Sequence, residues 1–101
     1  MRDAGWMTLT PGDIAIRASR PSFRALLLTC VATGREIDLY AETLPDSPDH
    51  DWSVDLSDLE NWVRPAMVPI SREERRALAA AIKGWADVGG LRVRWDGRLA
   101  E

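Results

Sequence analysis

Residues 71–95 read SREERRALAAAIKGWADVGGLRVRW and carry the clearest structural signals of this 101-residue chain. Ser71 and Glu74 stand at the spacing of a capping box, in which each side chain satisfies a backbone N–H group at the start of a helix. The apolar residues that follow recur at helical spacing: Leu78, Ala81, Ile82, Trp85 and Val88. The pattern predicts a helix over residues 72–88.

The signals on either side of this helix predict how the chain enters and leaves it. Gly89 and Gly90 suit the left-handed conformation that ends many helices. Residues 91–95 then alternate apolar and basic side chains, as a half-buried strand does. On the other side, Pro65 and Pro69 indicate an irregular link before the helix.

The first half of the chain predicts a run of strands. Residues 13–18, 35–44 and 52–57 alternate apolar with polar side chains, which is typical of strands with one buried face. Residues 23–32 are apolar on both sides through their middle, which predicts a central strand, although residues 25–28 alone would also suit a helical turn. We therefore expect a single α+β domain over residues 1–101. It should hold a mainly antiparallel sheet, formed by a meander and a C-terminal strand, with one long helix packed on one face.

Acidic residues are concentrated in one block. Residues 36–63 read EIDLYAETLPDSPDHDWSVDLSDLENWV and hold nine carboxylates without a Lys or Arg, whereas the whole chain has a net charge of only −3. Apolar residues are interleaved with these acids, so the charge should lie on a folded surface rather than on a disordered tail. Strand alternation predicts that Glu36, Asp38, Glu42 and Asp55 share the water-facing side of the sheet.

Composition argues against several classes of protein. The longest apolar run, residues 77–82, has six residues, far fewer than the roughly 18 to 20 that cross a bilayer, and the N-terminal residues lack the pattern of a secretion signal. We therefore expect a cytoplasmic protein without a membrane partner. Cys30 is the only cysteine and lies in an apolar run, so we expect a buried, unreactive thiol.

Metal and catalytic motifs are also missing from the sequence. The segment DSPDHD, residues 46–51, groups acids with His50, the only histidine, but it lacks the D-x-D-x-D-G order of a calcium loop. No phosphate-binding glycine loop, H-E-x-x-H motif or nucleophile with a supporting base is present. We expect no metal, no cofactor and no enzymatic activity.

Two segments resemble a known family. The order of a short meander, DLSDLENW (residues 55–62), a proline-spaced link and PISREERRALAAAIKGWADVGGLRVRW (residues 69–95) resembles small immunity proteins carried beside bacterial polymorphic toxins, including those of contact-dependent growth inhibition. The resemblance covers residues 14–95 in pattern and residues 62–95 in motif detail. It implies a protein that binds a cognate toxin domain, often a nuclease, and blocks it inside the producing cell. No binding residue is carried over from the family.

The acidic block is compatible with that role, because a nuclease holds a basic cleft for phosphate and an acidic surface complements such a cleft. We expect aromatic anchors from Tyr40, Trp52 or Trp62, with Trp52 more suited to the core, as Trp85 and Trp95 are. The candidate partner-binding residues are Asp46, Asp49, Asp51, Asp55, Asp58, Glu60 and Trp62. The same acids would also serve as a solvated face that maintains solubility.

Two other functions remain open at this point. One is a general acidic protein-binding module. The other is a small nucleic-acid-binding regulator that uses C-terminal arginines, namely Arg72, Arg75, Arg76, Arg92, Arg94 and Arg98. A pI of about 5.1 and the acidic block argue against nucleic acid as the partner. The toxin's activity, the way it is blocked and the oligomeric state are left open.

Overall fold

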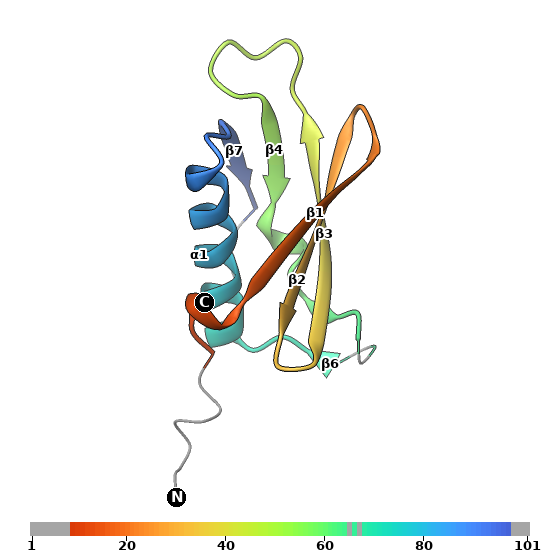
Figure 1. The fold of residues 1–101 in the computed structure, drawn as a ribbon, viewed down its shortest axis with the longest axis vertical. Coiled ribbons are helices and arrows are strands. Elements are labelled where there is room, and N and C mark those ends of the chain that lie inside the picture. Colours follow the sequence, from red (N-terminus) through yellow and green to blue (C-terminus); the bar gives the residue numbers. More distant parts are fainter. Residues whose placement is uncertain (1–8, 65, 67, 98–101) are drawn as a thin grey trace, which may run out of the picture.

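The computed structural model describes residues 9–64, 66 and 68–97, which form an α+β fold with one long helix against a five-stranded sheet (Figure 1). The sheet order is β1-β2-β3-β4-β7, and β5 and β6 form a separate two-stranded pair. The elements are η2 (Pro11–Asp13), β1 (Ala15–Ser22), β2 (Ala25–Ala32), β3 (Arg35–Thr43), β4 (Trp52–Asp55), η3 (Leu56–Asp58), β5 (Asn61–Trp62), β6 (Val68–Pro69), α1 (Arg72–Val88) and β7 (Val93–Asp96).

Strands β1 to β4 form the antiparallel meander that the alternating segments predicted. Leu28 of β2 pairs with Leu39 of β3, and Ala41 of β3 pairs with Val54 of β4. The last strand, β7, pairs with β4 in parallel. Parallel neighbours cannot be joined by a tight turn, so the chain needs a long crossover between them, and α1 lies within that crossover. The prediction of a mainly antiparallel sheet is confirmed.

The sheet has an inner face that meets α1 and an outer face turned away from it. Strand alternation sends the apolar side chains inward, where the buried core includes Leu28, Cys30, Ile37, Leu39, Ala41 and Val54. Leu78 and Ile82 of α1 are fully buried in the same core. The residues of β3 that alternate with these buried side chains therefore lie on the outer face of the sheet. They include the acids Glu36, Asp38 and Glu42.

The helix α1 has the bounds and caps that its sequence predicts. The Ser71 hydroxyl accepts a hydrogen bond from the Glu74 backbone N–H at 3.1 Å, and the Glu74 carboxylate accepts one from the Ser71 N–H at 2.9 Å. After the helix, Gly90 has a φ of 70°, a conformation that glycine adopts without strain. Val88, which the pattern placed on the apolar face, is instead 92% exposed, because it occupies the last position of the helix.

Strand ends depart from the predictions where local hydrogen bonds compete with pairing. Phe23 and Arg24 form the turn between β1 and β2, so β1 continues to Ser22 and β2 begins only at Ala25. At the end of β4, the Asp55 carboxylate accepts a hydrogen bond from the Ser57 N–H at 2.9 Å, which starts the short helix η3 in place of a longer strand. The short strands β5 and β6 lie in the segment predicted to be irregular.

The tryptophans occupy the core to different degrees. Trp52 is buried, as expected for the apolar side of its strand. Trp85 and Trp95 were expected to be core residues, but each is only partly buried and packs at the margin of the core. Trp85 lies near the C-terminal end of α1 and Trp95 lies on the edge strand β7, where fewer neighbours cover them.

Candidate functional site

The outer face of β3 carries three acidic residues and a tyrosine, which are Glu36, Asp38, Tyr40 and Glu42. Two of these acids interact within the chain. Glu36 forms ion pairs with Arg64 and, at 3.8 Å, with Arg17, and the Arg64 hydrogen bond lowers the pKa of Glu36. The Thr29 hydroxyl donates to Asp38 at 2.9 Å. Strand alternation thus placed these residues correctly, but part of their charge is already compensated.

A second group of acids gathers where β4 ends. Glu42, Asp55, Asp58 and Glu60, here called the acidic cluster, are close enough for their charges to interact. Partial loss of hydration raises the pKa of Asp58, and the negative charges of Asp55, Glu60 and Glu42 raise it further. The Asp55 carboxylate also accepts hydrogen bonds from the Ser57 hydroxyl and N–H, which lower its own pKa.

Within the described residues, the side chains of Glu42, Asp58 and Glu60 make no hydrogen bond or ion pair. All three are exposed. Asp55 therefore has a structural contact as the cap of η3, whereas the other three members of the acidic cluster present uncompensated negative charge to solvent. The sequence identified Asp55, Asp58 and Glu60 as candidates, and the fold adds Glu42 to them.

The loop between β3 and β4 carries the remaining candidates, Asp46, Asp49 and Asp51, here called the loop acids. Arg92 donates two hydrogen bonds to the Asp51 carboxylate, at 2.9 and 3.0 Å, and a third to the Pro48 carbonyl at 3.3 Å. The Arg92 hydrogen bond lowers the pKa of Asp51. This two-pronged contact ties the loop to the segment before β7, so Asp51 has a structural role in addition to its charge.

The other two loop acids are more available. Asp46 and Asp49 are exposed, and within the described part of the chain their side chains form neither a hydrogen bond nor an ion pair. Asp49 contributes a weaker attraction to Arg92 from a distance. Both side chains therefore keep their charge for solvent or for a partner.

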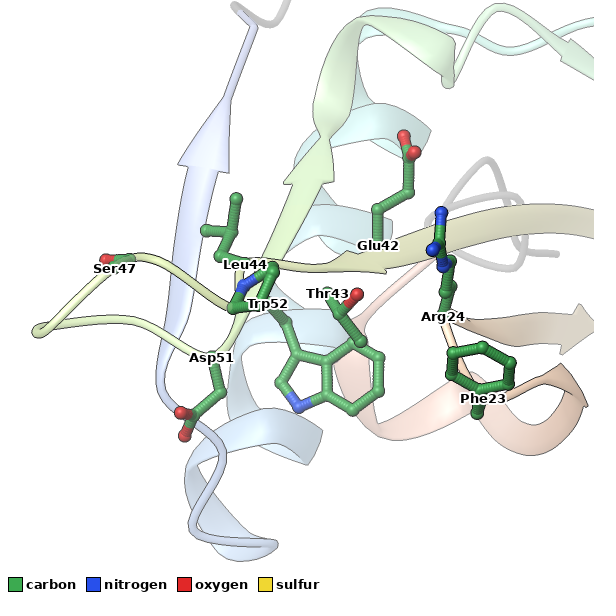
Figure 2. Close-up of a pocket in the computed structure, with 9 residues that line it drawn as sticks. Phe23, Arg24, Glu42, Thr43, Leu44, Ser47, Asp51 and Trp52 are labelled. Carbon is green, nitrogen blue, oxygen red and sulfur yellow. The ribbon is translucent and has the colours of Figure 1, made fainter.

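A groove of about 760 Å³ lies beside this loop. Figure 2 shows the Trp52 ring between the loop, with Ser47 and Asp51, and the β1–β2 turn, with Phe23 and Arg24. The remaining lining residues are Glu42, Thr43, Leu44 and Pro45. The groove combines an apolar floor with charges of both signs at its edge, an arrangement that accepts a protruding side chain of a partner. The sequence did not predict it, because its walls come from separate turns.

The structure corrects the prediction for Trp62. This residue is 1% exposed and belongs to the core, so it is not a surface anchor. Its ring has the largest apolar area available on the short strand β5, and burying that area outweighs the cost of leaving its indole N–H without a hydrogen-bond partner among the described residues. Tyr40 is 55% exposed and remains available as an aromatic contact.

The C-terminal arginines of the nucleic-acid hypothesis are largely engaged within the protein. Arg75 donates to the Ile70 carbonyl at 3.0 Å, Arg92 holds Asp51, and Arg94 pairs with Asp96 at 3.2 Å. Arg98 lies outside the described residues. These contacts reduce the positive charge that the segment would offer to phosphates.

In the part of the chain that the structure describes, no three His, Cys, Asp or Glu side chains are placed to hold a metal ion, and no helix is long and apolar enough to span a bilayer. Cys30 is buried as expected, and burial raises the pKa of its thiol to about 12.

Comparison with known proteins identifies no relative: no family model, curated protein or solved structure matches this chain.

Proposed function

We propose that this protein is an immunity protein, which binds and neutralises a cognate toxin domain in the cytoplasm of the cell that produces both. The observation that carries this proposal is a set of exposed carboxylates without a hydrogen bond or ion pair among the described residues: Glu42, Asp46, Asp49, Asp58 and Glu60. These five lie on the outer face of the sheet, on the adjacent β3–β4 loop and after β4.

Charge distribution favours a partner over a role in solubility alone. A surface that only maintains solubility works best with both signs interspersed, because clustered like charges repel one another. In the acidic cluster this repulsion persists in the folded protein: besides partial loss of hydration, the negative charges of Asp55, Glu60 and Glu42 raise the pKa of Asp58. A basic partner would relieve the repulsion on binding, and its attraction to the cluster would speed association and orient the complex.

The residues divide into two roles in this proposal. The acidic cluster and the free loop acids Asp46 and Asp49 contact the toxin, whereas Asp51 and Asp55 hold the loop and η3 in the shape that presents the others. The groove between Phe23 and the loop would accept a protruding toxin side chain next to Glu42. A nuclease is the toxin class that fits best, because its phosphate-binding cleft is basic.

The test is a binding measurement with the toxin domain encoded beside this gene. The double variant Glu42→Gln/Asp58→Asn removes two uncompensated charges. The matched control, Glu73→Gln/Asp87→Asn, removes two exposed carboxylates from α1, on the opposite side of the sheet. We expect the first variant to weaken binding about tenfold or more, mainly through slower association at low salt, and the control to bind like the original protein.

Two results would contradict the proposal. One is equal binding by both double variants, which would leave the acidic cluster without a role in recognition. The other is a failure of the protein to inhibit the neighbouring toxin in a cell that expresses both. Thermal unfolding of each variant serves as the folding control, because all four positions are exposed and their replacement should leave the fold intact.

A further inference from the structure

Aromatic rings in this protein are regularly paired with cations. In the described residues, four rings have a guanidinium or amine group 5.5 to 5.8 Å from the ring centroid. The pairs are Arg20 with Trp52, Arg24 with Phe23, Arg35 with Trp62 and Lys83 with Trp95. The negative face of an aromatic ring attracts a cation, and the attraction strengthens where water is excluded.

Tyr40 differs from these rings in two respects. Its ring is 55% exposed, yet no cation of the described residues lies over it. Its surroundings on the outer face are also negative. Asp38 and Glu42 lie two positions away on the same strand and on the same face of the sheet. Leu27, its pair on β2, provides an apolar contact on the other side.

We propose that the Tyr40 ring receives one arginine side chain of the basic partner, which stacks on the ring while its N–H groups donate to the neighbouring carboxylates. This inference rests on the proposed function and assigns the centre of that interface. A guanidinium fits better than an ammonium group, because it is planar, stacks on aromatic faces and donates several hydrogen bonds in one plane. The surrounding carboxylates repel an anionic ligand and leave a cation as the matching group.

Phe23 provides an internal control for this idea. It is even more exposed, at 76%, and it lies on the same molecule at the β1–β2 turn. However, the Arg24 guanidinium already lies 5.6 Å from its ring centroid, and Arg20 donates a hydrogen bond to its carbonyl at 3.1 Å. A second cation would meet repulsion there. Exposure of an aromatic ring alone therefore does not predict arginine binding, whereas the setting of Tyr40 does.

The composition of the chain makes the test direct, because Tyr40 is its only tyrosine and Phe23 its only phenylalanine. Incorporation of 3-fluorotyrosine or 4-fluorophenylalanine gives a single fluorine signal on each surface. The full-length protein is titrated with hexa-arginine amide at low ionic strength. We expect the fluorotyrosine signal to shift in a saturable manner and the fluorophenylalanine signal to stay nearly unchanged.

Variants then separate the ring from the charges. Tyr40→Leu should lower the affinity for hexa-arginine about threefold to thirtyfold, with a smaller loss for hexa-lysine. The control Val88→Ala, at the exposed end of α1, should leave both affinities unchanged. If hexa-arginine binds and Glu42→Gln/Asp58→Asn weakens it, but Tyr40→Leu does not, this inference is wrong and the proposed function stands. If hexa-arginine does not bind the original protein at low salt, the acidic surface attracts no cation and both proposals fail.

Discussion

Replacing Asp58 with asparagine should make the protein more stable at neutral pH. Partial loss of hydration and three neighbouring acids raise the pKa of Asp58 in the folded state, so its ionised form is less favourable there than in the unfolded chain. The stability linked to this group is complete below the unfolded pKa and is lost as the pH rises through the higher folded pKa. At about pH 7 the carboxylate therefore opposes folding, and an uncharged side chain of the same shape removes that opposition.

The size of this gain follows from the surroundings of Asp58. The side chain is exposed, and each of its like-charge contacts, with Asp55, Glu60 and Glu42, should cost a few tenths of a kcal/mol at a hydrated surface. The total gain should stay below about 1 kcal/mol. In a domain of this size, 1 kcal/mol corresponds to a rise in Tm of about 4 to 8 °C, so a shift of a few degrees is measurable.

Asp51 provides a control that should respond in the opposite direction. Its hydrogen bonds with Arg92 lower its pKa in the folded state, so its contribution to stability is present above the unfolded pKa and is lost as the pH falls through the folded value. Asp51→Asn should therefore destabilise the protein at neutral pH. Both variants remove one negative charge, so a general effect of net charge would move them in the same direction.

Urea unfolding at about pH 7 and about pH 3, each at low salt and at about 0.5 M NaCl, would measure these effects. The gain from Asp58→Asn should shrink at about pH 3, where the original carboxyl group is protonated, and at high salt, where surface charges are screened. A destabilised Asp58→Asn protein, or a gain that is unchanged by pH and salt, would refute the reasoning about the acidic cluster. Binding would then also lack its electrostatic explanation.

Three further predictions concern the core, the thiol and metals. Leu78→Ala or Ile82→Ala should lower the free energy of unfolding by about 2 to 5 kcal/mol, whereas Val88→Ala on the exposed end of α1 should change it by less than about 0.5 kcal/mol, as urea titrations would show. Cys30 should resist iodoacetamide at about pH 8 until the protein unfolds, because burial raises its thiol pKa to about 12, and mass spectrometry after short exposures checks this. Excess EDTA or added calcium should leave the Tm unchanged, and a rise of several degrees with calcium would indicate a site that the sequence and structure do not predict.

The helices and strands of this fold were predictable where apolar residues recur along the sequence at the regular spacing of a helix or a strand. The helix over residues 72–88 combines a capping box, apolar spacing and a glycine stop, and all three depend on residues close together in the chain. The strand predicted over residues 35–44 has the clearest alternation of apolar and polar side chains, and its buried and exposed faces are the predicted ones. Strand ends were predicted less well, because turns and caps such as the Asp55 contact with Ser57 compete with pairing there.

The candidate site was predictable only as a list of charges. The acidic block identified the loop acids and most of the acidic cluster, but it did not show which carboxylates are compensated, because their partners are remote in sequence. Arg92 reaches Asp51 across 41 positions, and Arg64 reaches Glu36 across 28. The groove beside Trp52 is likewise formed by two turns that only the sheet brings together.

The sequence by itself determined the fold class, the helix, the polarity of the strands and the concentration of acid in residues 36–63, because these properties depend on near neighbours and on composition. Tertiary structure alone decided that Trp62 lies in the core, and that β7 pairs with β4 in parallel. Both outcomes depend on which distant segments cover a given side chain. Burial and charge compensation arise from contacts between such segments. These contacts form only when the whole chain folds, so local sequence patterns do not reveal them.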